Sequence, residues 1–238
     1  MPTISLFLVE PVPTINEIIA KLDKKKIGET WFRAKRSKFL STEVEIDYFF
    51  YESLEDNLKK VVNGEEYYDI ISVLTKNGNY SILRKVVCYF NEKLGLLEIC
   101  RGHDEVTKRL KTILEKILEV RLLPVSMNSE ELVNLIRNHS VELRQAMFKN
   151  VDGFWYTILR GSHLEKNSKF SEYLLKNHNS LRVISIRPKI RFLRSRYTVT
   201  INGDKGTLKF FSGSIFKWRP RFEIRQMIFI IASMIGLI

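Results

Sequence analysis

The sequence predicts an α+β fold made of two tandem copies of an α-β-β-α-β-β-β-α unit, with antiparallel sheets and helices packed on one face. Segments with the apolar period of helices and segments that alternate like strands recur in the same order in both halves. The last hairpin and the closing helix of the two halves also align. Pro124 interrupts a helical pattern between Arg121 and Asn128, so we place the boundary between residues 1–123 and residues 124–238.

Each copy is predicted to begin with a helix. Ile15–Leu22 and Glu130–Ile136 show the 3.6-residue apolar period. Thr14 and Glu17 fit a capping box for the first helix, and Ser129 is expected to cap the second.

Two strands, a short helix, three strands and a closing helix are predicted to complete each copy, and an apolar strand over Met1–Glu10 precedes the first. The paired strands are Trp31–Lys38 and Glu43–Glu52 in the first copy and Val141–Lys149 and Phe154–Gly161 in the second, followed by helices near Leu54–Val62 and Lys169–Lys176. The first pair opposes a basic face to an acidic one, which indicates exposed cross-strand ion pairs. Those residues are Arg33, Lys35, Glu43, Glu45 and Asp47.

The strongest internal match joins the two last hairpins. Residues 87–102 align without gaps on residues 198–213. Asn91 matches Asn202 and Gly95 matches Gly206, and these are residue types that tight turns require. The following helices match at Glu105, Val106, Leu110, Ile113 and Ile117 against Glu223, Ile224, Ile228, Ile231 and Ile235.

The positive charge lies almost entirely in the second copy. Residues 1–123 carry 20 Lys and Arg against 19 Asp and Glu, whereas residues 124–238 carry 19 against 8, or +11 of the net +12. No acidic residue lies between Tyr173 and Gly203. The positive electrostatic potential of the second copy favours a polyanionic partner, because Lys and Arg that neutralise phosphates release counterions.

The second hairpin is predicted to present a basic, hydroxyl-rich face. Alternation turns Tyr197, Val199, Ile201, Leu208 and Phe210 toward the core and Arg194, Arg196, Thr198, Thr200, Thr207, Lys209 and Phe211 outward. The matching face of the first copy is neutral and mostly apolar: Lys85, Val87, Tyr89, Leu96, Glu98 and Cys100. We expect that apolar face, and an all-round apolar closing helix, to be covered within the molecule or by a partner.

Two further segments extend the basic surface. Residues 214–222 form an insertion in which basic and aromatic residues interleave, and residues 182–191 alternate cations with apolar residues up to an edge or an end near Pro188. The predicted nucleic-acid contacts are Arg187, Lys189, Arg191, Arg194, Arg196, Lys209, Phe211, Lys217, Trp218, Arg219 and Arg221. A solvated basic face and aromatics packed as a core plug are the alternative interpretation.

The sequence contains no motif for catalysis, metals or cofactors. HExxH, CxxC, Walker, GxGxxG and GxSxG patterns are absent. His163 follows Arg160-Gly161-Ser162 in a loop context that favours a structural role. Cys88 and Cys100 are too few for a disulfide scaffold, which predicts a cytoplasmic, reducing location; the alternative is a single bridge between them.

We therefore expect a non-catalytic nucleic-acid-binding protein without cofactors, acting through its second copy. The alternative is an interaction subunit of a larger nucleic-acid-processing or defence complex that docks a protein partner, or a second copy of itself, through the first copy and the apolar closing helix. Binding to an anionic membrane surface is less favoured, because the cations map to strands rather than to an amphipathic helix. The apolar run Met227–Ile238 is shorter than the roughly 20 residues that cross a bilayer.

Overall fold

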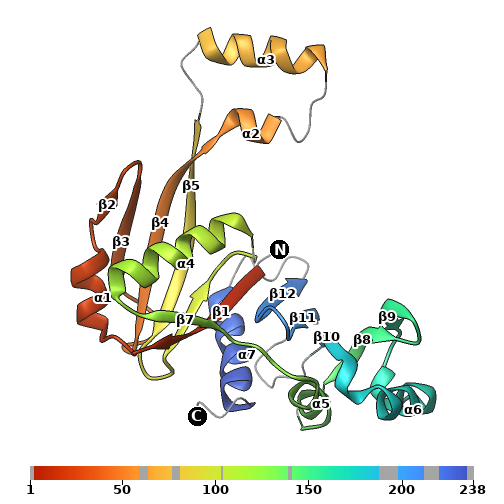
Figure 1. The fold of residues 1–238 in the computed structure, drawn as a ribbon. Helices are drawn as coiled ribbons and strands as arrows, with labels where there is room; N and C mark the ends of the chain where they lie inside the picture. The colour runs from red at the N-terminus through yellow and green to blue at the C-terminus, as the bar shows by residue number, and fades with distance from the viewer. Residues whose placement is uncertain are drawn as a thin grey trace. The chain divides into compact units, whose positions relative to one another are not determined.

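The computed structural model describes residues 3–58, 64–76, 81–102, 104–138, 141–187, 198–211 and 220–234. The protein is α+β, and its strands pair antiparallel (Figure 1). Contacts divide the chain into a smaller unit, Thr14–Phe90, and a larger unit formed by Met1–Pro13 with Asn91–Ile238. This division does not follow the predicted boundary at residues 123 and 124.

The smaller unit is a four-strand sheet in the order β2-β3-β4-β5 with helices attached. Its elements are α1 (Ile15–Leu22), β2 (Lys26–Ile27), β3 (Thr30–Arg36), β4 (Glu43–Ser53), α2 (Leu54–Leu58), α3 (Glu65–Lys76) and β5 (Ser81–Asn91). Helix α1 packs on β3 and β4, and the predicted capping box of Thr14 and Glu17 is present.

The opposed charges of β3 and β4 pair as predicted, but their environment differs. Lys35 lies opposite Glu45 and their charged groups are 2.8 Å apart. Asp47 is buried and its carboxylate lies 3.2 Å from Lys85 Nζ, and Glu43 is also buried and accepts a hydrogen bond from Ser37. The expectation of an exposed acidic face is therefore wrong, because two of its three carboxylates are buried and each has a partner.

Helix α3 occupies a place where the duplicated plan expects a strand. Only β5 and β6 lie between α3 and the next helix in the described chain, rather than three strands. Gly64 precedes α3 with a φ of +86°, and Lys76 ends it. A glycine in this conformation redirects the chain, and a cation in the last turn complements the helix dipole.

The larger unit contains a sheet in the order β6-β1-β12-β11-β10-β8-β9, and β7 also pairs with β1. Its strands are β1 (Thr3–Glu10), β6 (Leu96–Ile99), β7 (Arg121–Pro124), β8 (Glu142–Val151), β9 (Phe154–Arg160), β10 (Leu181–Arg187), β11 (Thr198–Asn202) and β12 (Thr207–Phe211). The segment expected to separate two copies thus forms a strand. Strand β10 lies between β11 and β8, so it is not an edge, and Pro188 lies outside the described residues.

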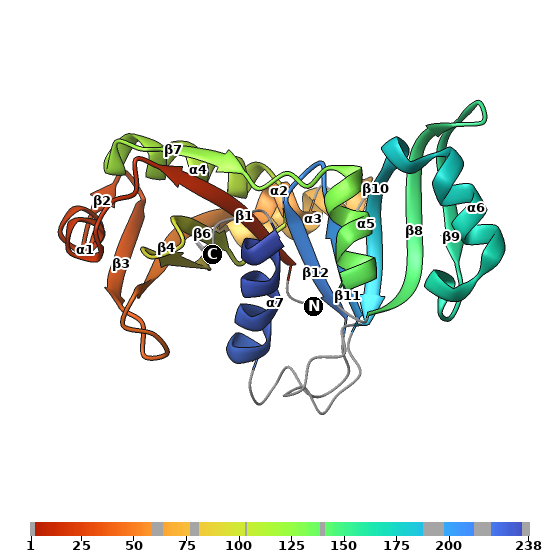
Figure 2. The same cartoon turned by 90° about the horizontal axis from the view of Figure 1, so that it is seen from below.

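Helices α5, α6 and α7 cover one face of this sheet, which we call the helix face. The unit's helices are α4 (Glu105–Leu118), α5 (Ser129–Asn138), η1 (Leu164–Lys166), α6 (Ser168–Lys176), η2 (His178–Ser180) and α7 (Pro220–Met234). One buried cluster joins apolar residues of α5, α6 and α7 to those of the strands, and Figure 2 shows α5 and α7 on the viewer's side of β10–β12. Phe229 and Ile230 of α7 are half-buried against the same cluster, so α7 is covered mainly from within the chain.

The first turn of α5 is capped by Asn128 rather than by Ser129. The Asn128 side chain accepts a hydrogen bond from the Glu131 amide at 2.9 Å, and Glu131 accepts one from the Asn128 amide at 2.6 Å. Ser129 instead donates from its hydroxyl to the Leu181 carbonyl at 3.0 Å. The cap shifts by one residue because asparagine completes the reciprocal box with a glutamate three residues later.

The two hairpin turns that align in sequence have the same local geometry. Asn91 accepts a hydrogen bond from the Leu94 amide, and Asn202 accepts one from the Lys205 amide, each at 3.1 Å. Gly95 has a φ of +59° and Gly206 a φ of +57°.

The second turn is also pressed against the segment that follows β7. A Cβ atom on Gly206 would lie 2.5 Å from the Val125 carbonyl oxygen, and one on Gly203 would lie 2.3 Å from that of Met127. The Met127 amide donates to the Gly203 carbonyl at 3.0 Å. Residues 125–127 therefore hold the β11–β12 turn by close backbone contact.

Substituting Gly206→Ala is expected to destabilise the larger unit more than Gly153→Ala. Both glycines have positive φ, and a left-handed non-glycine residue costs about 1–2 kcal/mol. Only Gly206 adds a steric clash, since nothing lies within 4 Å of a Cβ on Gly153. Urea denaturation followed by tryptophan fluorescence measures the difference, and equal losses would contradict the close packing.

Candidate nucleic-acid interface

The sheet face opposite the helix face, over β9, β8, β10, β11, β12 and the start of β1, is the candidate interface, and we call it the outer face. Alternation in β11 and β12 is confirmed: Val199, Ile201, Leu208 and Phe210 are fully buried on the helix face. Thr198, Thr200, Thr207, Lys209 and Phe211 have solvent access.

A row of polar side chains crosses the outer face from one strand to the next. Paired positions place Arg160 opposite Gln145, Gln145 opposite Ser185, and Ser185 opposite Thr200. Thr200 in turn lies opposite Lys209, which lies opposite Thr3. This polar row of Arg160, Gln145, Ser185, Thr200, Lys209 and Thr3 contains no carboxylate.

Hydrogen bonds fix the side chains in the middle of the polar row. Arg160 Nε donates to Gln145 Oε1 at 2.9 Å, and the hydroxyls of Ser185 and Thr200 are 2.7 Å apart. Such contacts hold the hydroxyls and the amide in place; Ser185 is buried, whereas Gln145 and Thr200 keep partial solvent access.

Lys209 and Phe211, two of the predicted contacts, lie together on this face. The Lys209 ammonium is 5.0 Å from the centre of the Phe211 ring. This cation–π contact orients the lysine. Because the cation occupies the ring face, Phe211 is better suited to positioning Lys209 than to stacking on a base.

Strand β9 adds an aromatic group that the sequence argument did not single out. Phe154, Trp155 and Tyr156 are consecutive and are 66%, 79% and 54% exposed, and Ile158 is 45% exposed. Tyr156 and Ile158 alternate with Arg160 and therefore share the outer face. In the sequence, three adjacent aromatics beside a turn with Gly153 could have indicated an exposed aromatic group. Alternation alone predicted only that these residues form a strand.

Arg187 lies at one end of β10, near a carboxylate. Its Nη1 is 3.8 Å from Glu142 Oε2, and Glu142 also pairs with Arg144 at 2.7 Å. Arg187 Nε has no hydrogen-bond partner among the described residues. Arg187 is thus partly neutralised by Glu142, and its Nε is buried.

The placement expected for Arg221 is wrong. Arg221 is 7% exposed at the start of α7, and its Nη1 and Nη2 donate to the two carboxylate oxygens of Glu98, which is 3% exposed on β6. Glu98 lies opposite Leu6, on the helix face. Arg221 therefore holds the start of α7 on the sheet through Glu98 instead of facing a ligand.

The remaining predicted contacts lie outside the described residues. They are Lys189, Arg191, Arg194, Arg196, Lys217, Trp218 and Arg219. Their binding role stays a prediction from sequence.

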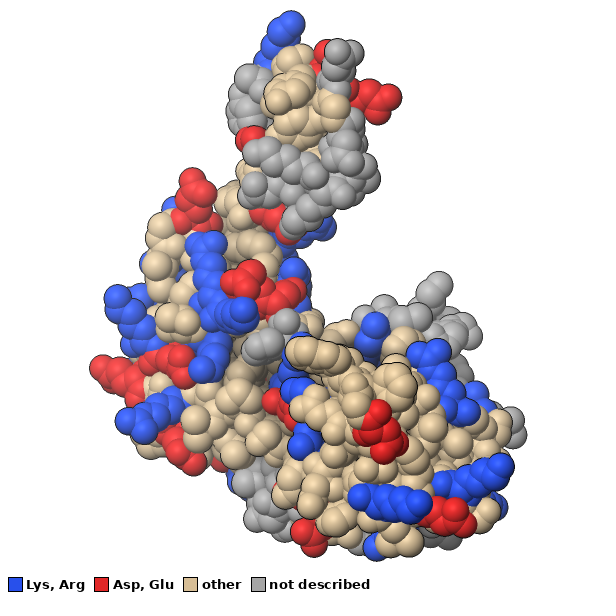
Figure 3. All heavy atoms as spheres, turned by 45° about the vertical axis from the view of Figure 1, so that its right-hand side comes forward, with Lys and Arg blue, Asp and Glu red and all other residues tan. Residues whose placement is uncertain are grey.

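Figure 3 shows how described cations are distributed on the carboxyl-terminal part of the larger unit. Lys and Arg side chains stand there singly or in small groups among uncharged and acidic side chains. Asp204, for example, lies 3.3 Å from Arg182 Nε. On this view the described surface carries dispersed cations rather than one continuous field.

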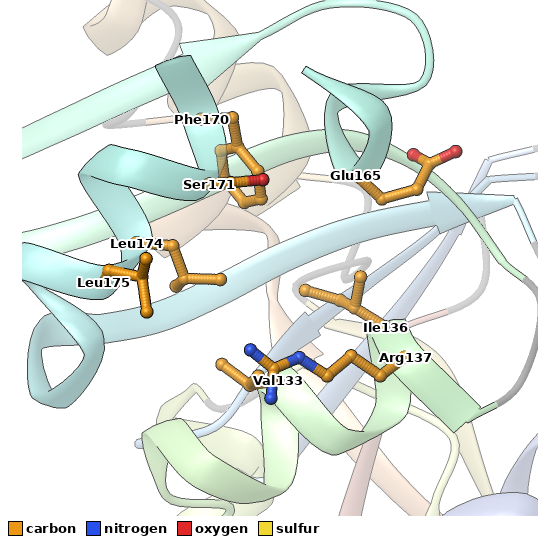
Figure 4. A pocket seen from close by; sticks show the side chains of 8 residues that line it. All are labelled: Val133, Ile136, Arg137, Glu165, Phe170, Ser171, Leu174 and Leu175. Atoms are coloured by element: carbon orange, nitrogen blue, oxygen red, sulfur yellow. The ribbon is translucent and has the colours of Figure 1, made fainter. Parts of the chain in front are cut away.

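A groove between α5 and α6 is a separate feature. It encloses about 350 Å³, and its side chains come from α5, η1 and α6 (Figure 4). The lining is mainly apolar: Val133, Ile136, Arg137, Glu165, Phe170, Ser171, Leu174 and Leu175. It lies among the helices, away from the polar row.

His163 and Glu165 form a structural contact at the end of this groove. His163 Nδ1 lies 3.1 Å from Glu165 Oε1, and the Leu143 amide donates to Glu165 Oε2 at 2.8 Å. Burial raises the pKa of Glu165, but these hydrogen bonds outweigh it and hold that pKa below its ordinary value.

In the described ranges, no three His, Cys, Asp or Glu side chains gather as a metal site requires, and no helix is long and apolar enough to cross a membrane. Cys88 and Cys100 are both free thiols. No protein-family model matches the sequence, and no curated protein matches it significantly.

Arg221→Met is expected to destabilise the protein by about 3–5 kcal/mol, because it leaves a buried carboxylate without its arginine. The double variant Glu98→Leu with Arg221→Met should recover most of this loss, since it removes both charges. Urea denaturation measures both free energies of unfolding. A double variant no more stable than Arg221→Met would contradict the pairing.

Glu165→Gln is expected to lower the free energy of unfolding at pH 7 by about 1–2 kcal/mol, through weaker hydrogen bonds to the amide and imidazole. Because the folded pKa is depressed, the ionised form stabilises the protein above the ordinary value of 4.5 and this contribution is lost as pH falls below it. The difference between variant and wild type should therefore shrink in acid. Glu172→Gln, at an exposed position on α6, serves as the control.

Proposed function

We propose that the protein binds single-stranded nucleic acid on the outer face and performs no chemistry on it. The polar row carries this proposal, because it combines two cations with hydroxyl and amide donors and lacks carboxylates. From β9 to β12 it spans about 19 Å at a strand spacing of about 4.8 Å. That length suits a chain of phosphates better than one small anion.

A single strand fits this face better than a duplex. A sheet face is too broad to enter a groove, whereas unstacked bases can lie on exposed side chains. Tyr156 supplies an exposed ring on the same face as Arg160 and Lys209. Arg187 and the basic segments outside the described residues would add phosphate contacts around this centre.

We propose as well that the chain is an internal duplication. Two capping boxes support it: Thr14 with Glu17, and Asn128 with Glu131. The matched turns at Gly95 and Gly206 support it further. Helix α3 marks a divergence of the first copy from the second.

Docking of a protein partner through the first copy is a second candidate. Helix α3 exposes Tyr68, Ile70 and Val73, with Tyr68 72% exposed. Helix α7 supports this candidate less, because its apolar residues already belong to the core. Pull-down with Tyr68→Ala and Val73→Ala variants tests whether α3 contacts a partner.

Lys209→Ala and Arg160→Ala are each expected to weaken binding of a labelled single-stranded oligonucleotide. Each should also reduce the slope of log affinity against log salt by about 0.7, the value for one phosphate contact on a single strand. Fluorescence anisotropy over a salt series measures both quantities.

Lys169→Ala is the matched control, since Lys169 is equally an exposed lysine but lies on α6 over the helix face. Its affinity and salt slope should equal those of wild type. Absence of binding at low salt, or an equal effect of Lys169→Ala and Lys209→Ala, would remove the outer face from consideration.

A further inference from the structure

Strand β9 is an edge of the larger unit's sheet without the usual protection of edges. Among the described strands it pairs only with β8. Edge strands are commonly guarded by charges, proline or bulges. Strand β9 reads Phe-Trp-Tyr-Thr-Ile-Leu-Arg, so its one charge stands at its end, and four of its apolar side chains are 45–79% exposed.

Hydrogen bonding to β8 shows which residues of β9 face the free edge. The Gly161 amide donates to the Arg144 carbonyl at 3.1 Å. Bonded and non-bonded pairs alternate along an antiparallel ladder, so Leu159 and Thr157 also direct their backbone groups to β8.

The intervening residues direct theirs away from β8. Tyr156, Ile158 and Arg160 therefore present N–H and C=O groups toward the open edge, where no described strand receives them. This alternating series of donors and acceptors is what an added strand requires.

We propose that β9 pairs antiparallel with β9 of a second copy of this chain, about a twofold axis at Thr157. Tyr156 then lies opposite the partner's Ile158, and Trp155 opposite the partner's Leu159. Phe154 lies opposite the partner's Arg160. Aromatic–aliphatic and aromatic–cation pairs of this kind are favourable across strands.

Charge favours a second copy as the occupant. The single cation of β9 meets an aromatic ring in this register and not another cation. The two Arg160 side chains stand about 20 Å apart, counted as six residues at about 3.4 Å, which exceeds the screening length near physiological salt. The strand is thus complementary to itself.

Pairing would also join the outer faces of the two copies. Residues directly opposite one another project from the same side of a sheet, so both outer faces lie on one side. The dimer itself does not rest on nucleic-acid binding. Dimerisation and nucleic-acid binding should respond oppositely to added salt. Higher salt should strengthen dimerisation of a chain with net charge +12 and weaken phosphate binding.

Disulfide trapping tests the register. On the axis, Thr157 forms a non-hydrogen-bonded pair with its own counterpart, with Cα atoms about 4.5 Å apart, which a disulfide can span. Oxidised Thr157→Cys should run as a covalent dimer on a non-reducing gel. Tyr156→Cys, placed opposite the partner's Ile158, should not.

Oxidised wild type controls for Cys88 and Cys100. Absence of a covalent Thr157→Cys dimer, or equal trapping of Tyr156→Cys, overturns the proposed pairing.

Ile158→Pro tests the backbone bonds without covalent chemistry. Proline removes an outward N–H but none that β8 receives, so the fold should keep its circular dichroism spectrum and melting temperature. Sedimentation velocity should show wild type passing from monomer to dimer between about 1 and 100 μM, as expected of a small interface, and Ile158→Pro staying monomeric.

Tyr68→Ala, which removes an exposed aromatic from α3, should dimerise like wild type. A wild type that stays monomeric at every concentration and salt level, or an Ile158→Pro variant that dimerises unchanged, overturns the proposal.

Discussion

The architecture of the larger unit depends on the backbone pairing of β1 along both of its edges. On one edge Leu6 lies opposite Glu98 of β6, and on the other Ile4 lies opposite Leu208 of β12. Beyond β12, β7 pairs with the rest of β1 on that second edge. Residues from both predicted copies thus enter one sheet, which explains why the compact units do not divide at residue 124. Because β1 pairs with β6 on one side and with β12 on the other, apolar residues of these three strands belong to one buried cluster.

Local chemistry explains which parts of this fold were predictable from sequence. The helical period located α1 and α6 almost to the residue, and alternation assigned the faces of β11 and β12 correctly, because both patterns depend only on near neighbours. The predicted cap of α5 was wrong by one residue, because Asn128 and Ser129 are both residue types that cap helices. Ser129 does not cap, because its hydroxyl donates to the Leu181 carbonyl. Helix α3 was also missed, because a short apolar run is compatible with a helix or with a strand.

Arg221 shows why the candidate site was harder to predict than the fold. A count of charged residues treats every cation as a surface group. A cation can instead form a buried ion pair with a carboxylate that is far away in the sequence. Glu98 lies 123 positions from Arg221, and no local pattern connects the two. Pairing of strands places Glu98 on the helix face, and α7 then supplies the arginine. The net charge of a segment therefore overstates the charge that a ligand meets, and Arg182 beside Asp204 makes the same point at the surface.

The burial of Arg221 does not affect the polar row, because the row results from the register of the strands and not from the density of charged residues. Ser185, Thr200 and Lys209 belong to three strands that are separated in sequence, and only their pairing aligns them. The Thr200 hydroxyl and the Lys209 ammonium, which Phe211 restrains, are donors in fixed positions, so a phosphate bound there would gain contacts without ordering many side chains. The exposed aromatics of β9 lie at the end of the same face, where stacking and strand pairing would use different parts of one residue. The ring of Tyr156 faces solvent, while its backbone faces the open edge. The proposed self-association would use the backbone of β9, and the side chains of Tyr156 and Arg160 would then lie beside side chains of the partner as well as on the outer face.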